Sequence, residues 1–421
     1  MKKRTYRRTP VNEFELSRLQ PETFGSRVVF AIDIAKVDMV AAVADSHGQV
    51  FDTVGWKAPS QNATVIDLLR RLRDRGFTAE VVMEASGTYG DVLRQMLEDD
   101  GFAVFRVNGK KTYDARELYD GVPSMHDAKA AAILARLHVE GLSAQIQAEP
   151  DDKRNLRAAI AIADLHQRRY LELVHKLESW LARYWPELPD LLALTSASLM
   201  ALLARIGGPA DVAAAPEEAR RLLNGISHRL LDAETVEAVV ASASTSLGVR
   251  PLPLERQALM AIAAEAHRSL RAFKEAKLTV ERLSADTPAR ALAPVVGSTT
   301  AAVIFTEVGD PNAFRSVAGF VKAMGLNLRE NSSGKTKGQL KLTKRGPARV
   351  RHYLWLAVHR WVQRDPIARA WYQSKKARDG GRASRAVVAM MRKLAKALFH
   401  VGRGAEFDST KLFDITRLGL A

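Results

Sequence analysis

A series of short apolar runs between residues 27 and 110 constrains the fold more than any other feature of the chain. Runs rich in β-branched residues predict strands, and runs whose apolar residues recur three and four positions apart predict helices. The order strand–strand–strand–helix–strand–helix–strand indicates an α/β fold in which the first two strands form a hairpin. The predicted strands cover residues 28–34, 39–44, 50–54, 80–83 and 103–107, and the predicted helices cover residues 63–75 and 91–99.

This order of elements is that of an RNase H-like domain, which we expect over residues 27–147. Three acidic residues are placed informatively in it. Asp33 interrupts the apolar run VVFAIDI, Glu84 follows the run EVVM, and Asp127 begins the helical segment DAKAAAILARLH. Carboxylates at the ends of adjacent strands can converge on Mg²⁺, which prefers oxygen ligands and bridges phosphates. Ordinary roles remain open, because Asp33 could face solvent on an edge strand and Asp127 could favour the helix N-terminus.

Residues 148–288 predict long helices, because their apolar positions alternate spacings of four and three. A period of 3.5 residues is typical of helices that pack along a seam, as in a coiled coil. Gln167 and Lys277 fall on the two predicted seams as polar positions that could set the register. The two helices could pair within one chain or across a dimer. Between them, residues from about 187 to 250 predict a small helical insert.

Residues 289–421 predict a second, mostly helical domain with a strongly basic segment. Ser333 lies in a Ser-Ser-Gly turn within that segment. Its hydroxyl could attack or grip a phosphate, although turn serines more often bond to their own backbone. Residues 294–297, which end in Gly297, are predicted to start a helix that runs through residue 308. The turn there could present backbone N–H groups to a DNA phosphate, or belong to an ordinary helical hairpin. The expected nucleic-acid contacts around the serine are Lys335, Lys337, Lys341, Lys344, Arg345, Arg349 and Arg351.

The charge balance indicates a polyanionic partner. The 421 residues include 63 Lys and Arg but 47 Asp and Glu, which gives a formal net charge of +16. Lys and Arg side chains that neutralise phosphates release counterions from the nucleic acid, which favours binding. We therefore expect a nucleic acid to be the partner of this chain. Residues 1–26 are predicted to be a basic arm that contacts phosphates, or else a frayed tail. Basic and aromatic residues also interleave over residues 348–400, which suits phosphate contacts and base stacking or, alternatively, a core with a solvated face.

Composition also excludes several classes of protein. No apolar run approaches the roughly 20 residues that cross a bilayer, and no signal peptide follows Met1, so a membrane partner is not expected. The chain has no cysteine, which excludes disulfides and thiolate zinc sites and makes the cytoplasm the expected location. The ten histidines show no spacing typical of a zinc site.

Several motifs in this order resemble the DEDD-type transposases of a large bacterial insertion-sequence family that includes the Piv invertase. Near the N-terminus these are AIDIAK, VVMEASGTYGDVL, FRVNGKK and HDAKAAAILARL. Near the C-terminus they are PVVGSTTAAVIFTEVGDPNAF and AMGLNLRENSSGKTKGQLKLTKRGPARVRHYL. The resemblance implies a RuvC-like domain with an RNase H fold, a linking coiled coil and a C-terminal serine-recombinase domain.

The resemblance also implies a mechanism and partners. Ser333 would form a covalent phosphoserine link to DNA, and Asp33, Glu84 and Asp127 would bind Mg²⁺ beside it. Donor and target DNA would be selected by pairing with a structured, non-coding bridge RNA. Members of the family act as dimers or tetramers, in which the serine and the carboxylates can belong to different subunits.

One family position departs from the pattern. The family has Asp-x-x-Asp on the last helix of the first domain, whereas here Asp127 is followed by Ala130. A second alignment makes Asp127 the later acid and Ser124 the earlier position. Either alignment removes one of four carboxylates, as in a natural three-acid subgroup or an engineered inactive protein. Three hypotheses therefore stand: a phosphoserine recombinase, a RuvC-like metal nuclease or junction resolvase, and a non-catalytic RNA- or DNA-binding protein.

Overall fold

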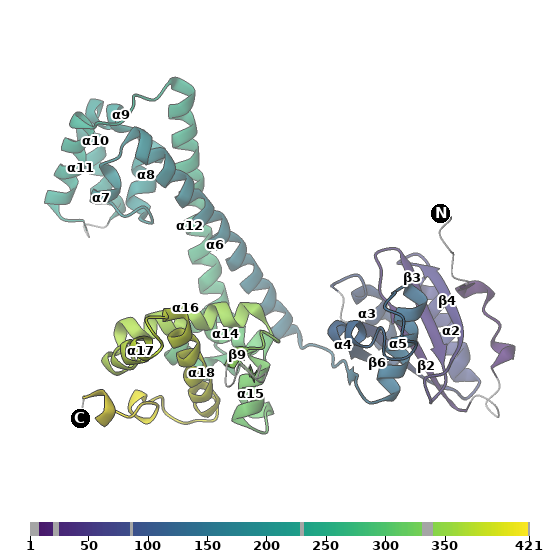
Figure 1. The fold of residues 1–421 in the computed structure, drawn as a ribbon. Helices are drawn as coiled ribbons and strands as arrows, with labels where there is room; N and C mark the ends of the chain where they lie inside the picture. The colour runs from purple at the N-terminus through teal and green to yellow at the C-terminus, as the bar shows by residue number, and fades with distance from the viewer. Residues whose placement is uncertain (1–7, 20–24, 85–86, 228–230, 331–339, 420–421) are drawn as a thin grey trace. The chain divides into compact units, whose positions relative to one another are not determined.

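The computed structural model describes residues 8–19, 25–84, 87–227, 231–330 and 340–419. The chain divides into two compact units, Met1–Ala148 and Glu149–Ala421. Each unit has its own hydrophobic core and its own architecture (Figure 1).

The first unit is built on a mixed sheet. Among its described residues, seven strands pair in the order β1-β4-β3-β2-β5-β6-β7. β2, β3 and β4 are antiparallel neighbours, and β5 and β6 then join parallel to β2. The prediction of an RNase H-like α/β domain is confirmed by this order of elements. The strands are β1 (Thr9–Pro10), β2 (Arg27–Asp33), β3 (Asp38–Ala44), β4 (Val50–Lys57), β5 (Thr78–Glu84), β6 (Ala103–Val107) and β7 (Ala144–Gln145).

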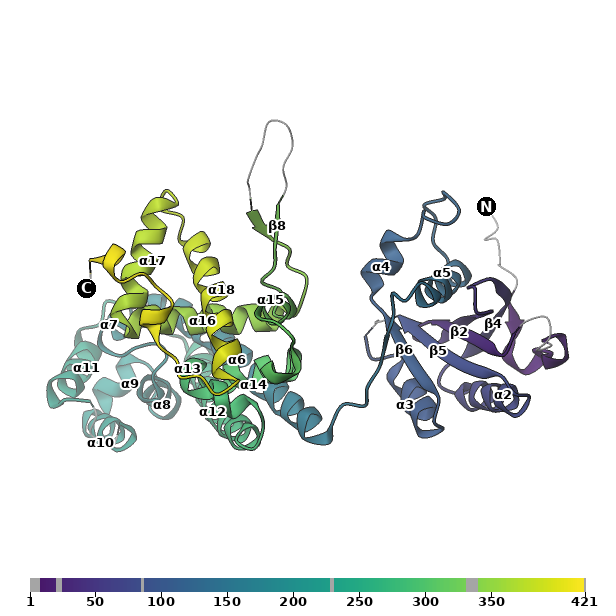
Figure 2. The same ribbon diagram turned by 90° about the horizontal axis from the view of Figure 1, so that it is seen from below.

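Helices cover both faces of this sheet (Figure 2). α2 (Asn62–Asp74) and α3 (Asp91–Asp99) pack on one face, and α5 (Asp127–Val139) packs on the other. Because side chains alternate along a strand, Phe30 and Ile32 of β2 enter the first core while its Val29 and Ala31 enter the second. Burial on both faces explains why the strands read as continuous apolar runs. The short helix α4 (Gly109–Asp114) follows β6.

Part of the segment expected to be a basic arm (residues 1–26) belongs to this domain, namely residues 8–19. Thr9 and Pro10 pair with β4, so the arm prediction is wrong for residues 8–19. The physical reason is apolar burial, because four side chains between residues 11 and 19 leave water for the core that contains α2. These side chains are Val11, Phe14, Leu16 and Leu19.

The second unit contains two long helices, α6 (Asp151–Tyr184) and α12 (Pro253–Ser284), which pack against each other within the chain (Figure 1). Each has a continuous buried stripe, as the 3.5-residue period predicts. Gln167 is half-buried, but Lys277 is exposed and Ala276 is buried in its place. The predicted polar seam position at Lys277 is therefore wrong, because the contact line passes through Ala276 at this turn before it returns to Val280.

A group of short helices fills the interval between α6 and α12. They share a core with the adjoining ends of the two long helices, through residues such as Tyr170 and Leu259. The two ends of this insert meet, since Val249 N donates to Arg183 O at 2.8 Å. The helices are α7 (Leu188–Leu191), α8 (Ala197–Arg205), α9 (Pro209–Ala214), α10 (Pro216–Ile226) and α11 (Ala233–Thr245).

The rest of the second unit packs on the opposite ends of α6 and α12, around Leu156, Ile160 and Val280. It is mostly helical, as the sequence predicts, but it also contains a short hairpin of β8 (Leu328–Glu330) and β9 (Leu340–Leu342) that the sequence did not reveal. Its helices are α13 (Ala289–Val296), α14 (Ser298–Glu307), α15 (Val317–Ala323), α16 (Ala348–Arg364), α17 (Pro366–Arg378) and α18 (Ala383–Val401).

Candidate active site and nucleic-acid interface

The strand register brings Asp33 and Glu84 to the same edge of the sheet. β2 and β5 are parallel and Ile32 pairs with Met83, so Asp33 and Glu84 are the last residues of neighbouring strands. The sequence suggested that Asp33 lies in the middle of its strand, but Asp33 is the last residue of β2. Alternation places both acids on the face that α5 covers, and Asp127 is the first residue of α5.

The electrostatics agree with this grouping. Burial raises the pKa of Asp33 to about 7, and the negative charges of Asp127 and Glu84 add to that effect. Burial also raises the pKa of Glu84. Asp33 is therefore close enough to two acids far away in the sequence to feel their negative charge, at a partly buried position where water screens it poorly. Such an arrangement is costly unless protons or a cation neutralise it.

The three acids suit a hard cation in their chemistry. All their donor atoms are carboxylate oxygens, the ligands that Mg²⁺ prefers, and Mg²⁺ commonly keeps several waters rather than filling an all-protein cage. Among the residues that the structure describes, no three His, Asp or Glu side chains converge into a ready-made metal cage. Asp33 feels the charges of Glu84 and Asp127, but the three carboxylates do not share one coordination point, and Asp127 is exposed.

Gly109 provides the space that Glu84 occupies. A Cβ atom built on Gly109 would overlap Glu84 Oε1, so the backbone at the start of α4 can approach the carboxylate only because this residue is glycine. Asn108 caps α4 by accepting a hydrogen bond from Lys110 N at 2.9 Å, which fixes the glycine in place. Gly109 belongs to the FRVNGKK motif, but nothing in the sequence alone linked it to Glu84.

A second polar cluster holds the other end of α5 to the sheet. Glu80 Oε2 accepts hydrogen bonds from Arg27 Nη2 at 2.6 Å and pairs with His138 Nε2 at 2.7 Å. Burial opposes ionisation of Glu80, but these bonds outweigh it and lower the pKa of Glu80 overall. His138 Nδ1 is 2.7 Å from Ser143 Oγ. Because each member has a partner, this cluster orients α5 and thereby Asp127.

Ala130 lies one helical turn after Asp127, on the same side of α5. Its side chain is buried, with 6% of its surface exposed. Ser124, the alternative position for the missing acid, is exposed before the helix begins. A methyl group therefore stands where an acid three residues after Asp127 would be.

The predicted nucleic-acid contacts fall into three groups. Ser333, Lys335 and Lys337 lie outside the described residues, in the segment that joins β8 to β9. The side chains of Lys341, Lys344 and Arg345 are exposed on or just after β9.

Arg349 and Arg351, the last of the predicted cations, have protein partners instead. Arg349 pairs with Asp164 at 3.1 Å and with Glu307 at 3.6 Å, which ties α16 to α6 and α14. Arg351 Nη1 donates to Gly346 O at 2.9 Å. The partners of Arg349 lie far away in the sequence, Asp164 by 185 residues, so only the tertiary fold reveals them.

Gly297 joins α13 to α14 with a φ of 84°, a conformation that favours glycine. The sequence had Pro294 to Gly297 starting a helix, whereas Pro294 lies inside α13 and Gly297 precedes α14. Arg360 donates to Val296 O at 2.8 Å, so a guanidinium group lies beside this turn. A cation and a helix N-terminus at one position are compatible with a phosphate contact.

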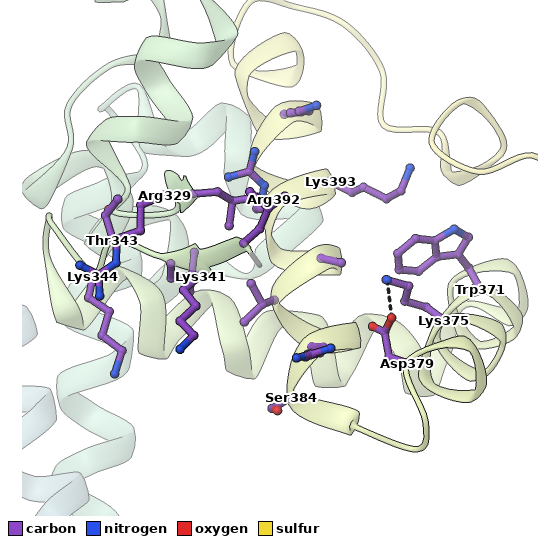
Figure 3. Close-up of a pocket in the computed structure, with 17 residues that line it drawn as sticks. Arg329, Lys341, Thr343, Lys344, Trp371, Lys375, Asp379, Ser384, Arg392 and Lys393 are labelled. Carbon is purple, nitrogen blue, oxygen red and sulfur yellow. Dashed lines mark hydrogen bonds and ion pairs between the residues drawn. The ribbon is translucent and has the colours of Figure 1, made fainter. Parts of the chain in front are cut away.

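A cavity of about 1100 Å³ opens between the β8–β9 hairpin and α17 and α18 (Figure 3). It contains Lys341 and Lys344 from the predicted set together with cations from residues 375–396. The sequence showed the latter as part of a basic and aromatic stretch, without indicating that they share a cavity with the hairpin.

Comparison with known proteins gives consistent matches at both ends of the chain. Residues 30–186 match a transposase family model, that of the DEDD domain of IS110 transposases. Residues 292–373 match the model of the transposase IS116/IS110/IS902 family. An uncharacterized protein of insertion element IS110 from Streptomyces coelicolor is 24% identical over 389 residues, which span 87% of this chain and 93% of the relative.

Within the described part of the chain, none of the helices combines the length and apolar character needed to span a bilayer.

Proposed function

Because this chain is a transposase of the IS110 family with a DEDD-type domain, we propose that it cleaves and rejoins DNA through a phosphoserine intermediate at Ser333. Asp33, Glu84 and Asp127 would hold Mg²⁺ for this reaction. The observation that carries the proposal is the grouping of these three acids at one edge of the RNase H-like sheet, expressed in the raised pKa of Asp33.

The roles of the acids follow from their positions. When bound, Mg²⁺ would stabilise negative charge on the oxygens of the reacting phosphate. Asp33 and Glu84 are held rigidly by paired strands, and Gly109 leaves room for the Glu84 carboxylate. Asp127 is oriented by α5, which the Arg27–Glu80–His138 cluster fixes to the sheet. The three acids thus start from regular strands and a helix and would have to converge on the ion when it binds, and Ala130 leaves the set with one carboxylate fewer than the family pattern.

The serine step conserves atoms and charge. Ser333 Oγ would form a bond to phosphorus and lose its proton, while the bond from phosphorus to the sugar oxygen of the departing strand breaks and that oxygen gains a proton. The phosphodiester is thereby exchanged for a phosphoserine ester of similar energy. Attack by the hydroxyl of a second strand reverses the exchange and joins the new strand.

The proposed partners are donor and target DNA, a bridge RNA and further copies of the chain in a dimer or tetramer. The net charge of +16 supports a nucleic-acid partner. If base pairing with RNA selects the DNA, the protein needs to recognise mainly backbone and shape.

Two other candidates have specific support. Asp33, Glu84 and Asp127, which we call the acid group, could alone support a metal nuclease or junction resolvase. They lie entirely within the first unit, and such an enzyme needs no serine. The buried methyl group of Ala130 favours a non-catalytic nucleic-acid-binding protein, since it removes one family acid.

A comparison of Ser333→Ala with Ser332→Ala separates these candidates. The recombinase predicts that Ser333→Ala abolishes strand joining and the protein–DNA adduct retained on a denaturing gel, whereas Ser332→Ala keeps both. Asp33→Ala should remove both activities, in the parent chain and in the Ser332→Ala background alike. Strand joining by Ser333→Ala at the parent rate would refute the nucleophile, and cleavage without any adduct would identify the nuclease. A discrete RNA that copurifies with the protein would support guidance by RNA.

A further inference from the structure

The cavity beside the β8–β9 hairpin, which we call the hairpin groove, is lined by far more positive than negative charge. Of the described residues that line it, eight are cations and one, Asp379, is an acid. Figure 3 shows Lys341 and Lys344 on the hairpin side, Arg392 and Lys393 on α18, and Trp371 on the α17 side. The eight cations are Arg329, Lys341, Lys344, Lys375, Arg385, Arg392, Lys393 and Lys396.

Three of these cations build the groove. Lys375 Nζ pairs with Asp379 at 2.8 Å within α17 and its C-terminal turn. Arg392 donates to Leu326 O, which ties α18 to the chain that leads into β8. Lys393 Nζ donates to Leu412 O at 2.6 Å and lies 5.3 Å from the centre of the Trp371 ring. These bonds hold the walls of the groove in place before any ligand binds.

The other five cations face solvent. Within the described ranges of the chain, none of them forms an ion pair with a carboxylate, so their charge is available to a ligand. They come from both walls, with two on α18 and three on or beside the hairpin. They are Arg329, Lys341, Lys344, Arg385 and Lys396.

The spacing of these charges suits an extended polyanion. Arg385 and Lys396 lie on one face of α18, and at 1.5 Å per residue they are roughly 16 Å apart along the helix axis. Between them the groove is lined by Val388 and Ala389, which are apolar. Trp371 lies at its edge, where its ring is 5.2 Å from that of Phe413. A charged rim over an apolar and aromatic floor can hold phosphates and bases at the same time.

The lining of the groove favours an unpaired strand. Unpaired bases can pack against Val388, Ala389 and Trp371, whereas the bases of a duplex are already paired and stacked inside it. We propose that the hairpin groove binds an unpaired nucleic-acid strand through its phosphates, with bases against its apolar floor.

This inference rests on the proposed function and extends it, because it assigns the recombinase a strand-binding site lined by β8 and β9, the two strands that flank the segment with Ser333. Binding itself needs neither the serine nor the carboxylates. The strand could be DNA or RNA, since both present the same phosphodiester backbone.

The test compares two triple variants of the full-length chain. The groove variant is Lys341→Gln/Arg385→Gln/Lys396→Gln. The control variant is Lys274→Gln/Lys277→Gln/Arg290→Gln, which removes the same charge from exposed positions on α12 and α13. Fluorescence anisotropy measures binding of a labelled single-stranded DNA, a single-stranded RNA of the same sequence and a duplex, at several salt concentrations. Thermal melting confirms that both variants fold.

The groove variant should bind the single strand about 10-fold to 100-fold more weakly. The slope of the logarithm of the binding constant against the logarithm of the salt concentration should become shallower by about 2, because each of three lost phosphate contacts contributes about 0.7. The control should change far less. A loss for DNA, RNA or both supports the groove and identifies the strand. An equal loss for the duplex, an equal loss in the control, or no loss would overturn the inference.

A second measurement makes the result specific to the site. Photocrosslinking of a strand that carries 5-iodouracil should give adducts within residues 371–396 in the parent chain, and adducts confined to other segments would contradict the proposal. Repeating it in Ser333→Ala separates the two proposals. If the crosslinks persist in Ser333→Ala, the strand binds independently of the serine. If they are lost only in the groove variant, the groove is supported and the assignment of Ser333 as nucleophile is not affected.

Discussion

The acid group of the first unit and the hairpin groove of the second treat like charges in opposite ways. At the acid group, Asp33, Glu84 and Asp127 come close together in a partly buried position, so that the pKa of Asp33 rises to about 7. In the groove, exposed cations such as Lys341 and Lys396 are spread along two walls. The first arrangement opposes folding until a cation or protons neutralise it, whereas solvent screens the second.

This difference indicates two kinds of binding. A concentrated, desolvated set of carboxylates suits one small cation held at a defined point. A dispersed set of solvated cations suits a long polyanion, each of whose phosphates contributes a modest amount. Single substitutions should therefore have large effects at the acid group, whereas the groove should need several changes at once.

Glu84→Gln should give the largest effect, because it replaces a carboxylate at the acid group with a neutral amide of the same shape. We expect strand cleavage to fall about 100-fold or more, with binding of DNA unchanged. Strand cleavage is measured with an oligonucleotide in the presence of Mg²⁺, and DNA binding is measured by fluorescence anisotropy. Glu13→Gln, at an exposed position of the same unit, is the matched control and should retain activity. Full activity in Glu84→Gln would remove Glu84 from the site and weaken the comparison.

Gly109→Ala should have an intermediate effect. The new methyl group would overlap the Glu84 carboxylate and displace it, so we expect cleavage to fall about 10-fold through misplacement alone. The control is Gly225→Ala in α10, where an added Cβ meets nothing within 4 Å. Unchanged cleavage in Gly109→Ala would mean that Glu84 can act from another position.

Asp33→Asn should have the smallest effect, measured as the melting temperature of the metal-free protein. The folded pKa of Asp33, about 7, exceeds the usual value of 3.8 for an exposed aspartate. Ionisation therefore disfavours the folded state, and the cost appears as pH rises above about 4 and is complete above about 7. Asp33→Asn should melt a few degrees higher than the parent at pH 8, and this difference should disappear as the pH falls toward about 4. Asp74→Asn, on the exposed face of α2, is the control. A lower melting temperature for Asp33→Asn at pH 8 would show that the carboxylate is stabilising there.

Much of the first unit was accessible from the sequence, because its signals are local. The strands that end at Asp33 and Glu84 are continuous apolar runs, and the helix that begins at Asp127 follows a break in them. The sequence gives the order of the acids but not their shared face, which depends on the pairing of Ile32 with Met83.

The second unit shows why the remainder could not be predicted. Arg349 reads as a phosphate contact within a basic segment, yet its partner Asp164 is brought to it by the packing of α16 on α6. The hairpin groove joins residues near 341 to residues near 392, and neither segment carries a signal of the other. Lys277 also fits a 3.5-residue period, yet at this one position the neighbouring Ala276 is buried instead, although Val280 follows the predicted seam again.

The meeting of Arg183 and Val249 where the insert begins and ends has a consequence for how this molecule can vary. Because α6 and α12 run side by side, the chain leaves and returns at one place, and the insert belongs to a different core from the helices around Leu156 and Val280. The length of the insert therefore does not affect the packing at the opposite ends of α6 and α12. Related proteins can have a longer or shorter insert without displacing residues 289–421, and a reporter can be grafted into one of the exposed loops of the insert.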